Sequence, residues 1–419
     1  MMRIETLATG DEVVNGDVID SNSAYVSASL SRRGYLIAKH TALPDDKDAL
    51  EEGIREISER ADLCICSGGL GPTEDDLTSE IVAKVLGVSV QVDEEALRRM
   101  KERFLKFGYR FSANNEKSSR IPKGCMVLQN DVGSAPGFSV KIRKCQFFFL
   151  PGVPREFYFF VDQAVLKWVE TSFPSGFGAV VQLKTLGYGE SHLAEKFEDY
   201  PRLFHKIKVG YRIHSPEVWI KLTAEGGPRQ ECLKTLQPAI DEAKRRLGNS
   251  IFGSDQDELD EIVHKLLLEK GLALSTAESC TGGRISQMLT AHPGSSAYFM
   301  GGAVVYSNEL KQKLLGVESL TLSQFGAVSS ETALAMAQGA RKNFGTDLAI
   351  AVTGIAGPTG GTPDKPVGLV YLSLASPSGD QVLRKRFRGA RLQVQKAAAY
   401  TALEMVRRQI MCLEPITDD

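Results

Sequence analysis

Apolar residues in the first part of the chain follow two different spacings. Short apolar runs at 3–9, 36–41 and 63–66 are bounded by polar residues or glycine, which favours buried strands. Between these runs, 22–33 and 47–60 repeat their apolar residues every three or four positions, which predicts amphipathic helices. Short strands that alternate with helices are typical of a parallel sheet with helices on both faces.

A turn-rich segment at 173–178 ends this region, and a smaller unit follows it up to about residue 250. The pattern predicts a strand, a helix, two neighbouring strands and a long helix, at 180–186, 191–199, 207–214, 217–224 and 230–247. This order of elements indicates a compact α+β unit.

The strand and helix alternation returns from about residue 257. It predicts strands at 272–277, 303–306, 348–352, 368–375 and 381–388, and helices at 259–270, 284–289, 330–344 and 393–409. A chain of 419 residues is too long for one ordinary core. We therefore predict an α/β protein with domains at 1–172, 173–252 and 253–419.

The stretch 278–283, Glu-Ser-Cys-Thr-Gly-Gly, joins a predicted strand to a predicted helix. The first N–H groups of a helix have no partner within the helix, and the helix dipole adds positive charge there, so an anion is favoured at this junction. The alternative is that Ser279 and Thr281 cap the helix while the glycines ease the turn.

Two later strands also end in polar residues. Tyr306 and Lys311 follow one of them, and the glycine-rich segment 353–368 follows another. Because ligands in such sheets lie beyond the carboxyl ends of the strands, the three strand ends predict one shared pocket.

Catalysis by a side-chain nucleophile requires a base and donors for an oxyanion, and this pocket offers candidates for each. Ser279 is the best nucleophile because it lies at the turn, near the N–H groups of Thr281 and Gly282, and Cys280 is its chemical rival. No histidine stands in these motifs, so the base has to be Lys311 with a pKa lowered by burial or by a neighbouring cation, or Tyr306 assisting.

These stretches together resemble the C-terminal domain of the CinA family, which is similar to the nicotinamide-nucleotide amidohydrolases. The resemblance implies an α/β deamidase domain that converts nicotinamide mononucleotide to nicotinic acid mononucleotide and ammonia, and it implies the same Ser279, Lys311 and Tyr306 arrangement without a cofactor. An arginine is expected near the substrate, and both Arg388 and Arg391 qualify, because relatives usually carry an acid where Ala390 stands. The expected substrate contacts are Glu278, Cys280, Thr281, Gly282, Thr353, Gly354, Gly357, Gly360, Gly361 and Arg391.

The N-terminal region carries its own glycine loop at 67–78, directly after an apolar strand. Its glycines allow backbone N–H groups to approach a phosphate, and Asp75 and Asp76 can hold a divalent cation. The alternative is that the two acids only favour a helix N-terminus.

This region resembles the molybdopterin-binding fold, a three-layer α/β/α domain shared by molybdopterin adenylyltransferases and the N-terminal domain of CinA proteins. The motifs are 9–12, 20–22, the glycine loop, 115–117, 130–138 and 150–156, with Asp11 where relatives often have Thr. The resemblance implies metal-dependent hydrolysis of ADP-ribose, and the expected contacts are Asn22, Gly68, Gly69, Gly71 and Thr73, with Asp75 and Asp76 on a metal of open identity. The middle unit is similar to a KH module, but it lacks a Gly-x-x-Gly loop in a basic context, so we expect no nucleic acid.

Composition narrows the remaining choices. A formal net charge of −2 without a long Lys and Arg run argues against a DNA footprint. No signal peptide and no apolar run of about 18 residues is recognisable, so we expect a cytoplasmic chain without membrane contact, and we expect it to pair as a homodimer. The seven cysteines are scattered, which suits reduced thiols. Two alternatives stay open: a regulatory or adaptor protein that binds nucleotides without turnover, and a molybdopterin-binding protein.

Overall fold

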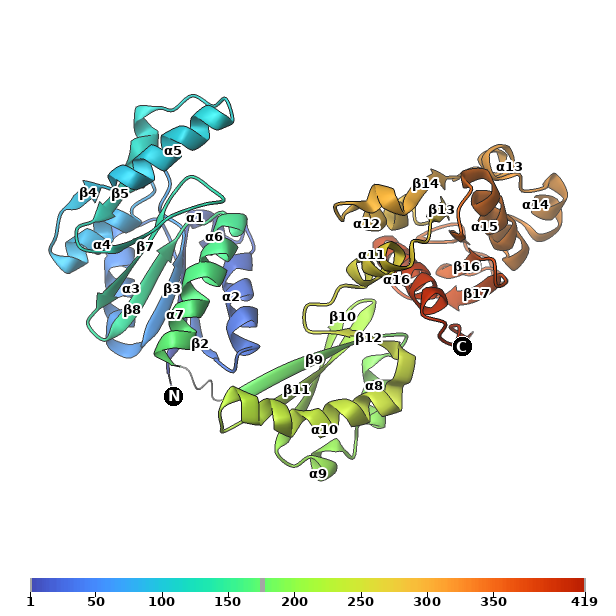
Figure 1. Cartoon of the computed structure of the whole chain (residues 1–419), viewed down its shortest axis with the longest axis horizontal. Helices are drawn as coiled ribbons and strands as arrows, with labels where there is room; N and C mark the ends of the chain where they lie inside the picture. The colour runs from blue at the N-terminus through green and yellow to red at the C-terminus, as the bar shows by residue number, and fades with distance from the viewer. Residues whose placement is uncertain (1, 174–177, 418–419) are drawn as a thin grey trace. The chain divides into compact units, whose positions relative to one another are not determined.

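A computed structural model describes residues 2–173 and 178–417 of the chain (Figure 1). Most of the predicted linker at 173–178 lies outside these residues. By internal contacts the chain forms two compact units, Met1–Val180 with Thr223–Gln237, and Val181–Leu222 with Pro238–Asp419. The three-domain boundaries remain a prediction.

The N-terminal domain is built on a six-stranded sheet in the order β2-β1-β3-β8-β7-β6 (Figure 1). The parallel strands are β2 (Ile37–Leu43), β1 (Ile4–Thr9), β3 (Leu63–Ser67) and β8 (Cys145–Leu150), and the antiparallel edge is β7 (Gly137–Ile142) and β6 (Met126–Leu128). The sequence pattern predicted a parallel sheet, and the antiparallel strands β7 and β6 differ from that prediction. Its helices are α2 (Ser21–Ser31), α3 (Lys47–Arg60), α4 (Thr78–Leu86), α6 (Pro154–Phe160) and α7 (Leu166–Ser172).

Strand β3 shows why this domain has three layers. Cys64 and Cys66 point into a core shared with α3 and α4, whereas Leu63 and Ile65 point into a second core shared with α2, α6 and α7. Because side chains alternate along a strand, an apolar run buried on both faces requires helices on both faces. The expected three-layer α/β/α domain is confirmed, and the free thiols of Cys64 and Cys66 are buried as predicted.

A small extension leaves this domain between β3 and β6. It contains the antiparallel pair β4 (Val90–Val92) and β5 (Arg120–Pro122), the helix α5 (Glu94–Lys106) and a short 3-10 helix at Ala113–Ser119. A further short helix, α1 (Asp11–Val14), follows β1.

The middle unit has a four-stranded sheet in the order β10-β11-β9-β12. Its elements are β9 (Gly178–Leu186), α8 (Glu190–Lys196), α9 (Tyr200–Leu203), β10 (Ile207–His214), β11 (Glu217–Glu225), α10 (Arg229–Leu247) and β12 (Ile251–Ser254). This confirms the predicted α+β unit.

The C-terminal domain has a five-stranded sheet in the order β14-β13-β15-β16-β17. Its strands β13 (Leu274–Glu278), β14 (Phe299–Val304) and β15 (Leu348–Gly354) are parallel, while β16 (Leu369–Ala375) and β17 (Gln381–Arg386) are antiparallel. Its helices are α11 (Leu259–Lys270), α12 (Arg284–Thr290), α13 (Asn308–Leu315), α14 (Ser319–Phe325), α15 (Ser330–Phe344) and α16 (Arg391–Ile410).

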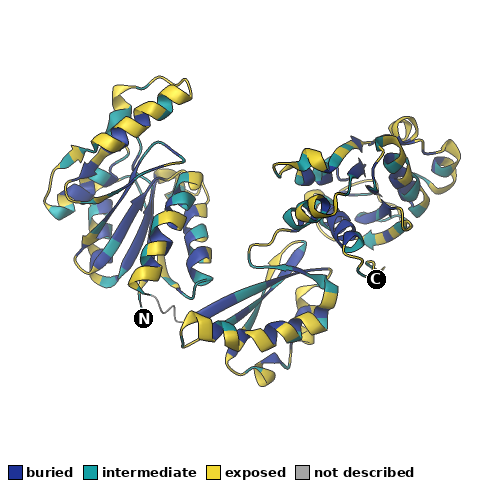
Figure 2. Ribbon diagram, in the orientation of Figure 1, coloured by how far each residue is buried: buried dark blue, intermediate teal, exposed yellow. Residues whose placement is uncertain are grey.

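The two faces of this sheet carry different side chains. Ile350 and Val352 of β15 pack in a large core with α11, α12 and α16, whereas Ala349 and Ala351 face α15. Small residues on the second face allow α15 to pack closely against the sheet. Figure 2 shows the resulting buried sheet beneath half-exposed helices. No helix in the described part of the chain is long and apolar enough to cross a membrane.

Candidate active sites

Ser279 and Lys311 meet at the carboxyl ends of β13 and β14. Ser279 leaves β13 in a turn that its N–H fixes by donating to the carbonyl of Val352, 2.9 Å away. Lys311 lies on α13, and its Nζ is 3.2 Å from Ser279 Oγ. Both side chains are nearly inaccessible, with 8% and 1% of their surface exposed. The structure thus brings the predicted nucleophile and the predicted base within hydrogen-bonding distance.

The surroundings of Lys311 favour its neutral form. Its Nζ donates to the carbonyl oxygens of Val305 at 2.8 Å and Tyr306 at 3.4 Å, which carry no formal charge. Burial lowers the pKa of Lys311, because an ammonium group that loses its water is less stable than a neutral amine. A neutral amine beside a hydroxyl can accept the proton of that hydroxyl.

Arg391 connects two of the three strand ends. Its guanidinium donates to the hydroxyl of Tyr306 at 2.8 Å and to the carbonyl of Gly357 at 2.9 Å. Tyr306 is 60% exposed and follows β14 by two residues, so the predicted strand at 303–306 ends earlier than expected. Of the two candidate arginines, Arg391 is therefore the one that contacts the predicted site, whereas Arg388 lines a different pocket.

Glu278 makes its contacts within the turn, and its predicted contact with substrate stays a prediction. Its carboxylate is fully buried and accepts four hydrogen bonds, from the N–H groups of Gly283, Ile285 and Ser286 and from the Ser286 hydroxyl, at 2.7–3.1 Å. An internal anion therefore occupies the N-terminus of α12, where the sequence suggested that a ligand anion would bind. Glu278 holds the turn that carries Ser279.

The thiol of Cys280 points into the core beside α12 and α16, and the predicted substrate contact of this residue stays a prediction. Burial raises the pKa of Cys280 to about 12, which leaves the thiol protonated and inert near neutral pH. Its carbonyl accepts a hydrogen bond from Gln395. The side chains of Ser279 and Cys280 thus point in different directions, one toward Lys311 and the other into the core.

The donors predicted for an oxyanion are only partly free. The N–H of Gly282 donates to the carbonyl of Ser279 at 3.2 Å, so it is engaged within the turn. The hydroxyl of Thr281 is buried and has no hydrogen-bond partner in the part of the chain that the structure describes. This hydroxyl can therefore still accept or donate a hydrogen bond, and the buried Nε of Arg284 at the start of α12 can still donate one.

The residues after β15 form the third side of the site. The hydroxyl of Thr353 donates to the carbonyl of Ala327 at 2.7 Å, so it is less free for a ligand than we predicted. A side chain at Gly354 would meet the carbonyl of Leu369, which explains the glycine there. Gly357 and Gly360 have positive φ, at 83° and 90°, and with Gly361 they form the loop that Arg391 contacts through Gly357.

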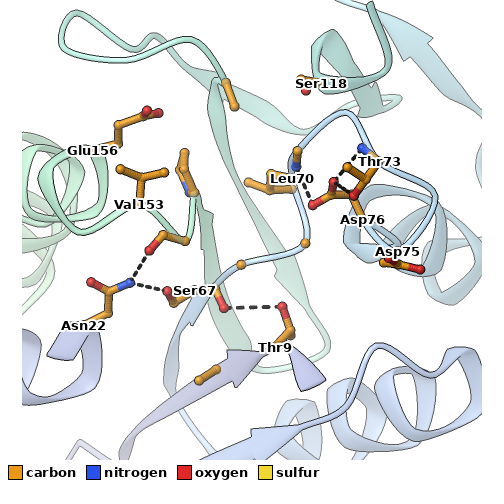
Figure 3. Close-up of a pocket in the computed structure, with 18 of the residues that line it drawn as sticks. Thr9, Asn22, Ser67, Leu70, Thr73, Asp75, Asp76, Ser118, Val153 and Glu156 are labelled. Atoms are coloured by element: carbon orange, nitrogen blue, oxygen red, sulfur yellow. Dashed lines mark hydrogen bonds between the residues drawn. The ribbon is translucent and has the colours of Figure 1, made fainter. Parts of the chain in front are cut away.

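The N-terminal domain has a pocket of about 650 Å³ at the carboxyl ends of β1, β3 and β8 (Figure 3). The predicted residues that line it are Asn22, Gly68, Gly69, Gly71, Thr73, Asp75 and Asp76. Gly68 and Gly69 take positive φ, at 109° and 66°, and a side chain at Gly68 would meet the carbonyl of Thr9 at 2.5 Å. Only glycine allows this loop to turn so close to β1.

Asp76 shapes the glycine loop from within. Its carboxylate accepts hydrogen bonds from the N–H of Gly71 at 2.7 Å, the N–H of Thr73 at 2.8 Å and the hydroxyl of Thr73 at 2.6 Å (Figure 3). Asp75 is exposed at the rim of the same pocket. The two neighbouring acids therefore differ, since Asp76 holds the loop and Asp75 does not contact it in this way.

Asn22 joins the strand ends on the other side of the pocket. Its amide donates to the hydroxyl of Ser67 at 2.7 Å and to the carbonyl of Gly152 at 2.8 Å (Figure 3). Its amide oxygen is buried and has no partner among the described residues. Asn22 thus positions the loops that follow β3 and β8.

Carboxylates outside the glycine loop complete the pocket, and sequence reasoning missed Asp45. Burial raises the pKa of Asp45, and the like charges of Glu12, Asp11 and Asp76 raise it further. Burial also raises the pKa of Glu156, whose carboxylate accepts a bond from Asn130. Asp45 could have been found from its position just beyond the carboxyl end of β2, the same sheet edge as the other acids.

The carboxylates of the N-terminal pocket fit a metal ion that also binds water and phosphate, and not one held by protein ligands alone. Among the described residues, no three His, Cys, Asp or Glu side chains come together closely enough to hold a metal ion. Mg²⁺ usually binds through one or two carboxylates with water and substrate phosphates completing its shell. The separate carboxylates of the pocket therefore suit a cation whose remaining ligands are water and a phosphate rather than one held by the protein alone.

Three family models match the chain. They are the CinA C-terminal domain at residues 256–410, a probable molybdopterin binding domain at 5–171, and the damage-inducible protein CinA KH domain at 182–253. These matches agree with the expected fold of each domain.

Relatives match along the whole length. A CinA-like protein of Citrifermentans bemidjiense is 39% identical over 412 residues, which cover 98% of each chain. A putative competence-damage inducible protein of Acetivibrio thermocellus is 38% identical over 414 residues, 99% of this chain and 100% of the relative. Among solved structures, a competence/damage inducible protein of Agrobacterium tumefaciens is 44% identical and covers 35% of this chain and 93% of its own, with a TM-score of 0.34. With this identity over nearly its full length, the chain belongs to the CinA family.

Proposed function

We propose that this chain is a bifunctional hydrolase of pyridine-nucleotide recycling. Its C-terminal domain deamidates nicotinamide mononucleotide, and its N-terminal domain hydrolyses the pyrophosphate of ADP-ribose. The observation that carries the proposal is the buried pair of Ser279 Oγ and Lys311 Nζ, 3.2 Å apart. A lysine that serves only the structure rarely lies buried without a carboxylate partner. A lysine that activates a serine nucleophile, by contrast, lies beside the hydroxyl and is made neutral by burial.

The deamidation follows from this pair. Neutral Lys311 takes the proton of Ser279 while Oγ attacks the carboxamide carbon, and the resulting tetrahedral intermediate expels ammonia with the proton that Lys311 returns. A water molecule then gives its proton to Lys311 and attacks the nicotinoyl ester. This step releases the carboxylic acid and restores the serine hydroxyl.

Binding of the nucleotide is assigned to the other strand ends. The guanidinium of Arg391 lies between Tyr306 and the glycine loop at 357–361, where it can attract a phosphate. The free hydroxyl of Thr281 is a candidate donor to the oxyanion.

In the N-terminal pocket, a bound divalent cation would neutralise part of the charge of the pyrophosphate. Asp75 is an exposed carboxylate that could hold it, and Asp76 contributes chiefly by holding the N–H groups of the glycine loop in place. Lys117, whose Nζ donates to the carbonyl of Thr73, lies at the same loop and offers a positive charge.

Ammonia release from nicotinamide mononucleotide tests the C-terminal assignment. We expect turnover by the purified chain and none by Ser279→Ala, with ADP-ribose hydrolysis by that variant unchanged. A folded wild-type chain that binds the mononucleotide without releasing ammonia would instead support a regulatory or adaptor role.

Formation of adenosine monophosphate and ribose 5-phosphate from ADP-ribose tests the N-terminal assignment. We expect this reaction to require a divalent cation, because the carboxylates of the pocket repel a pyrophosphate in its absence. Undiminished turnover in excess chelator would contradict the metal requirement. Sedimentation of the full chain tests the expected homodimer.

A further inference from the structure

We propose that Arg386 and Arg388 form a second anion site in the C-terminal domain, which binds the phosphate group of a small phosphorylated ligand other than the amide substrate. The site is a pocket of about 450 Å³ lined by Val367, Arg386, Phe387, Arg388 and Gly389. A volume of this order is sufficient for a nucleotide or a diphosphate.

The two guanidinium groups of this pocket are unpaired. Within residues 2–173 and 178–417, the guanidinium groups of Arg386 and Arg388 make no hydrogen bond or ion pair, although the backbone of Arg386 pairs with β16. Among the described residues, no acidic side chain lines the pocket. By contrast, Arg391 donates two hydrogen bonds, and Arg407 is paired with Glu404. Two adjacent guanidinium groups without an internal acid raise the local positive potential, and a ligand with a doubly charged phosphate relieves it.

The backbone holds the two arginines on one side. Phe387 lies between them and packs on the main core of the domain. Arg386 is the last residue of β17 and Arg388 follows it by two residues; both are exposed, whereas Phe387 is partly buried, so both arginines lie on the side away from that core. The N–H of Phe387 donates to the carbonyl of Gly368 at 2.9 Å, and a side chain at Gly368 would lie 2.0 Å from the carbonyl of Phe387. This close backbone contact fixes the spacing of the two guanidinium stems before any ligand binds.

The pocket is distinct from the amide site but touches the same loop. Arg391 faces Tyr306 and Gly357, whereas Arg388 lines the outer pocket with Arg386. Val367 belongs to the pocket wall, and its side chain lies where a Cβ at Gly357 would be. A ligand in the pocket would therefore contact the base of the loop that carries the Gly357 carbonyl.

The ligand class follows from the geometry of the guanidinium group. Each guanidinium presents parallel N–H groups that match two oxygens of a phosphate, so two of them suit a terminal phosphate or a diphosphate. Free pyrophosphate and the phosphate of a nucleotide share this chemistry. Titrations with inorganic pyrophosphate and with adenosine monophosphate distinguish the two sources.

Isothermal titration of the full chain tests the proposal. The titrations contain chelator, which suppresses cation-dependent binding in the N-terminal pocket. We expect one site for at least one of the two probes, and Arg386→Gln with Arg388→Gln to weaken its binding by roughly tenfold or more. Lys342→Gln is the matched control, because it removes a positive charge from the exposed surface of α15 in the same domain. Thermal melts show whether the double variant is folded.

Three results would overturn the proposal. The first is no binding of either probe at millimolar concentration, and the second is equal binding by the wild type and the folded double variant. The third is competition by nicotinic acid mononucleotide, which would make the pocket part of the amide site. The proposal is independent of the deamidase assignment: a chain that binds the probe through Arg386 and Arg388 but releases no ammonia would refute only the assigned reaction.

Discussion

The N-terminal pocket and the C-terminal site lie at the same position in their sheets but differ in charge and burial: carboxylates line the first, and a buried lysine lies in the second. Both lie where parallel strands end and a glycine turn leads into a helix. The N-terminal pocket is a volume of about 650 Å³ bordered by carboxylates, of which Asp75 is exposed and Asp45 and Glu156 are partly buried. The C-terminal pair is buried, with Ser279 and Lys311 only 8% and 1% exposed. Exposure suits the capture of a cation with its phosphate ligand, whereas burial makes a lysine neutral enough to act as a base.

The comparison also shows how each glycine turn is held. In the N-terminal loop, Asp76 accepts hydrogen bonds from the N–H groups of Gly71 and Thr73. In the C-terminal turn, Glu278 accepts them from Gly283, Ile285 and Ser286. Each domain therefore uses an acid of its own motif to order the backbone. The presence of an acid next to a glycine loop is therefore not sufficient to assign that acid to ligand binding.

Removal of Ser279 or Lys311 should separate the two activities most strongly. We expect Ser279→Ala to lower deamidation by roughly a thousandfold or more, and Lys311→Ala to do the same. The double variant should be no worse than either single variant, because members of one catalytic unit fail together. Turnover numbers and Michaelis constants for the three variants measure this, with thermal melts alongside.

Two other roles for Ser279 give different results. A helix cap would cost about 1 kcal/mol of stability and leave turnover nearly normal. A phosphate contact would chiefly raise the Michaelis constant. Near-normal turnover in Ser279→Ala would refute the nucleophile assignment.

The two acids of the N-terminal loop provide the reverse test. Asp76→Ala should reduce ADP-ribose hydrolysis by about 100-fold or more and leave deamidation intact, because three loop donors lose their acceptor. Asp75→Ala removes the same charge without loosening the loop, so its loss of activity should be recovered by a higher concentration of metal. Rates measured against metal concentration distinguish the variants. Equal behaviour of both would assign Asp76 to the metal directly.

The hydrogen bonds of Glu278 should contribute measurably to the free energy of unfolding. We expect Glu278→Gln to lower the free energy of unfolding by about 2–4 kcal/mol, because an amide presents N–H groups toward the N–H donors of α12. Glu309→Gln, an exposed acid in the first turn of α13, is the matched control and should change stability little. Chemical denaturation of both variants makes the comparison, and an unaffected Glu278→Gln would contradict the capping role.

The deamidation rate should depend on pH through Lys311. Burial lowers the pKa of this group, so the neutral base is present above the lowered value and is lost as the pH falls through it. The turnover number should therefore fall about tenfold per pH unit below that pKa and reach a plateau above it. A profile of the turnover number at saturating substrate, which excludes titration of free substrate, measures it. A flat profile down to pH 5 would exclude an amine base.

The smallest effect is expected at Cys280. Cys280→Ala removes one buried atom from the core and should lower the free energy of unfolding by about 1 kcal/mol. Deamidation should stay within about twofold of the wild type, since the thiol faces away from Lys311. A loss comparable to that of Ser279→Ala would restore Cys280 as a nucleophile.

Much of the fold could be predicted because its signals are local. The helices Lys47–Arg60, Leu259–Lys270 and Ser330–Phe344 were predicted to the residue. Periodic apolar residues define their buried faces, Asp46 caps the start of the first, and glycines end the other two. Strand β14 was displaced because it passes through Gly301 and Gly302, which indicate a turn in sequence.

The sites were predictable in position but less so in detail. Strand ends at one sheet edge brought Ser279, Tyr306 and Lys311 together, as the pattern indicated. The directions of Glu278 and Cys280 depend on the dihedral angles of the turn, which the sequence does not specify. The pairing of Arg391 rather than Arg388 with Tyr306 depends on where α16 begins.

The N–H groups at the start of α12 form a binding site for a carboxylate, and the side chain of Glu278 occupies this site. Truncation of this side chain in Glu278→Gly would leave a vacant cradle of N–H donors sized for one carboxylate. A small free acid such as formate or acetate should then enter the cradle and restore the melting temperature in a concentration-dependent way. The order of the turn in this variant, and with it the position of Ser279, would then depend on the concentration of the added acid.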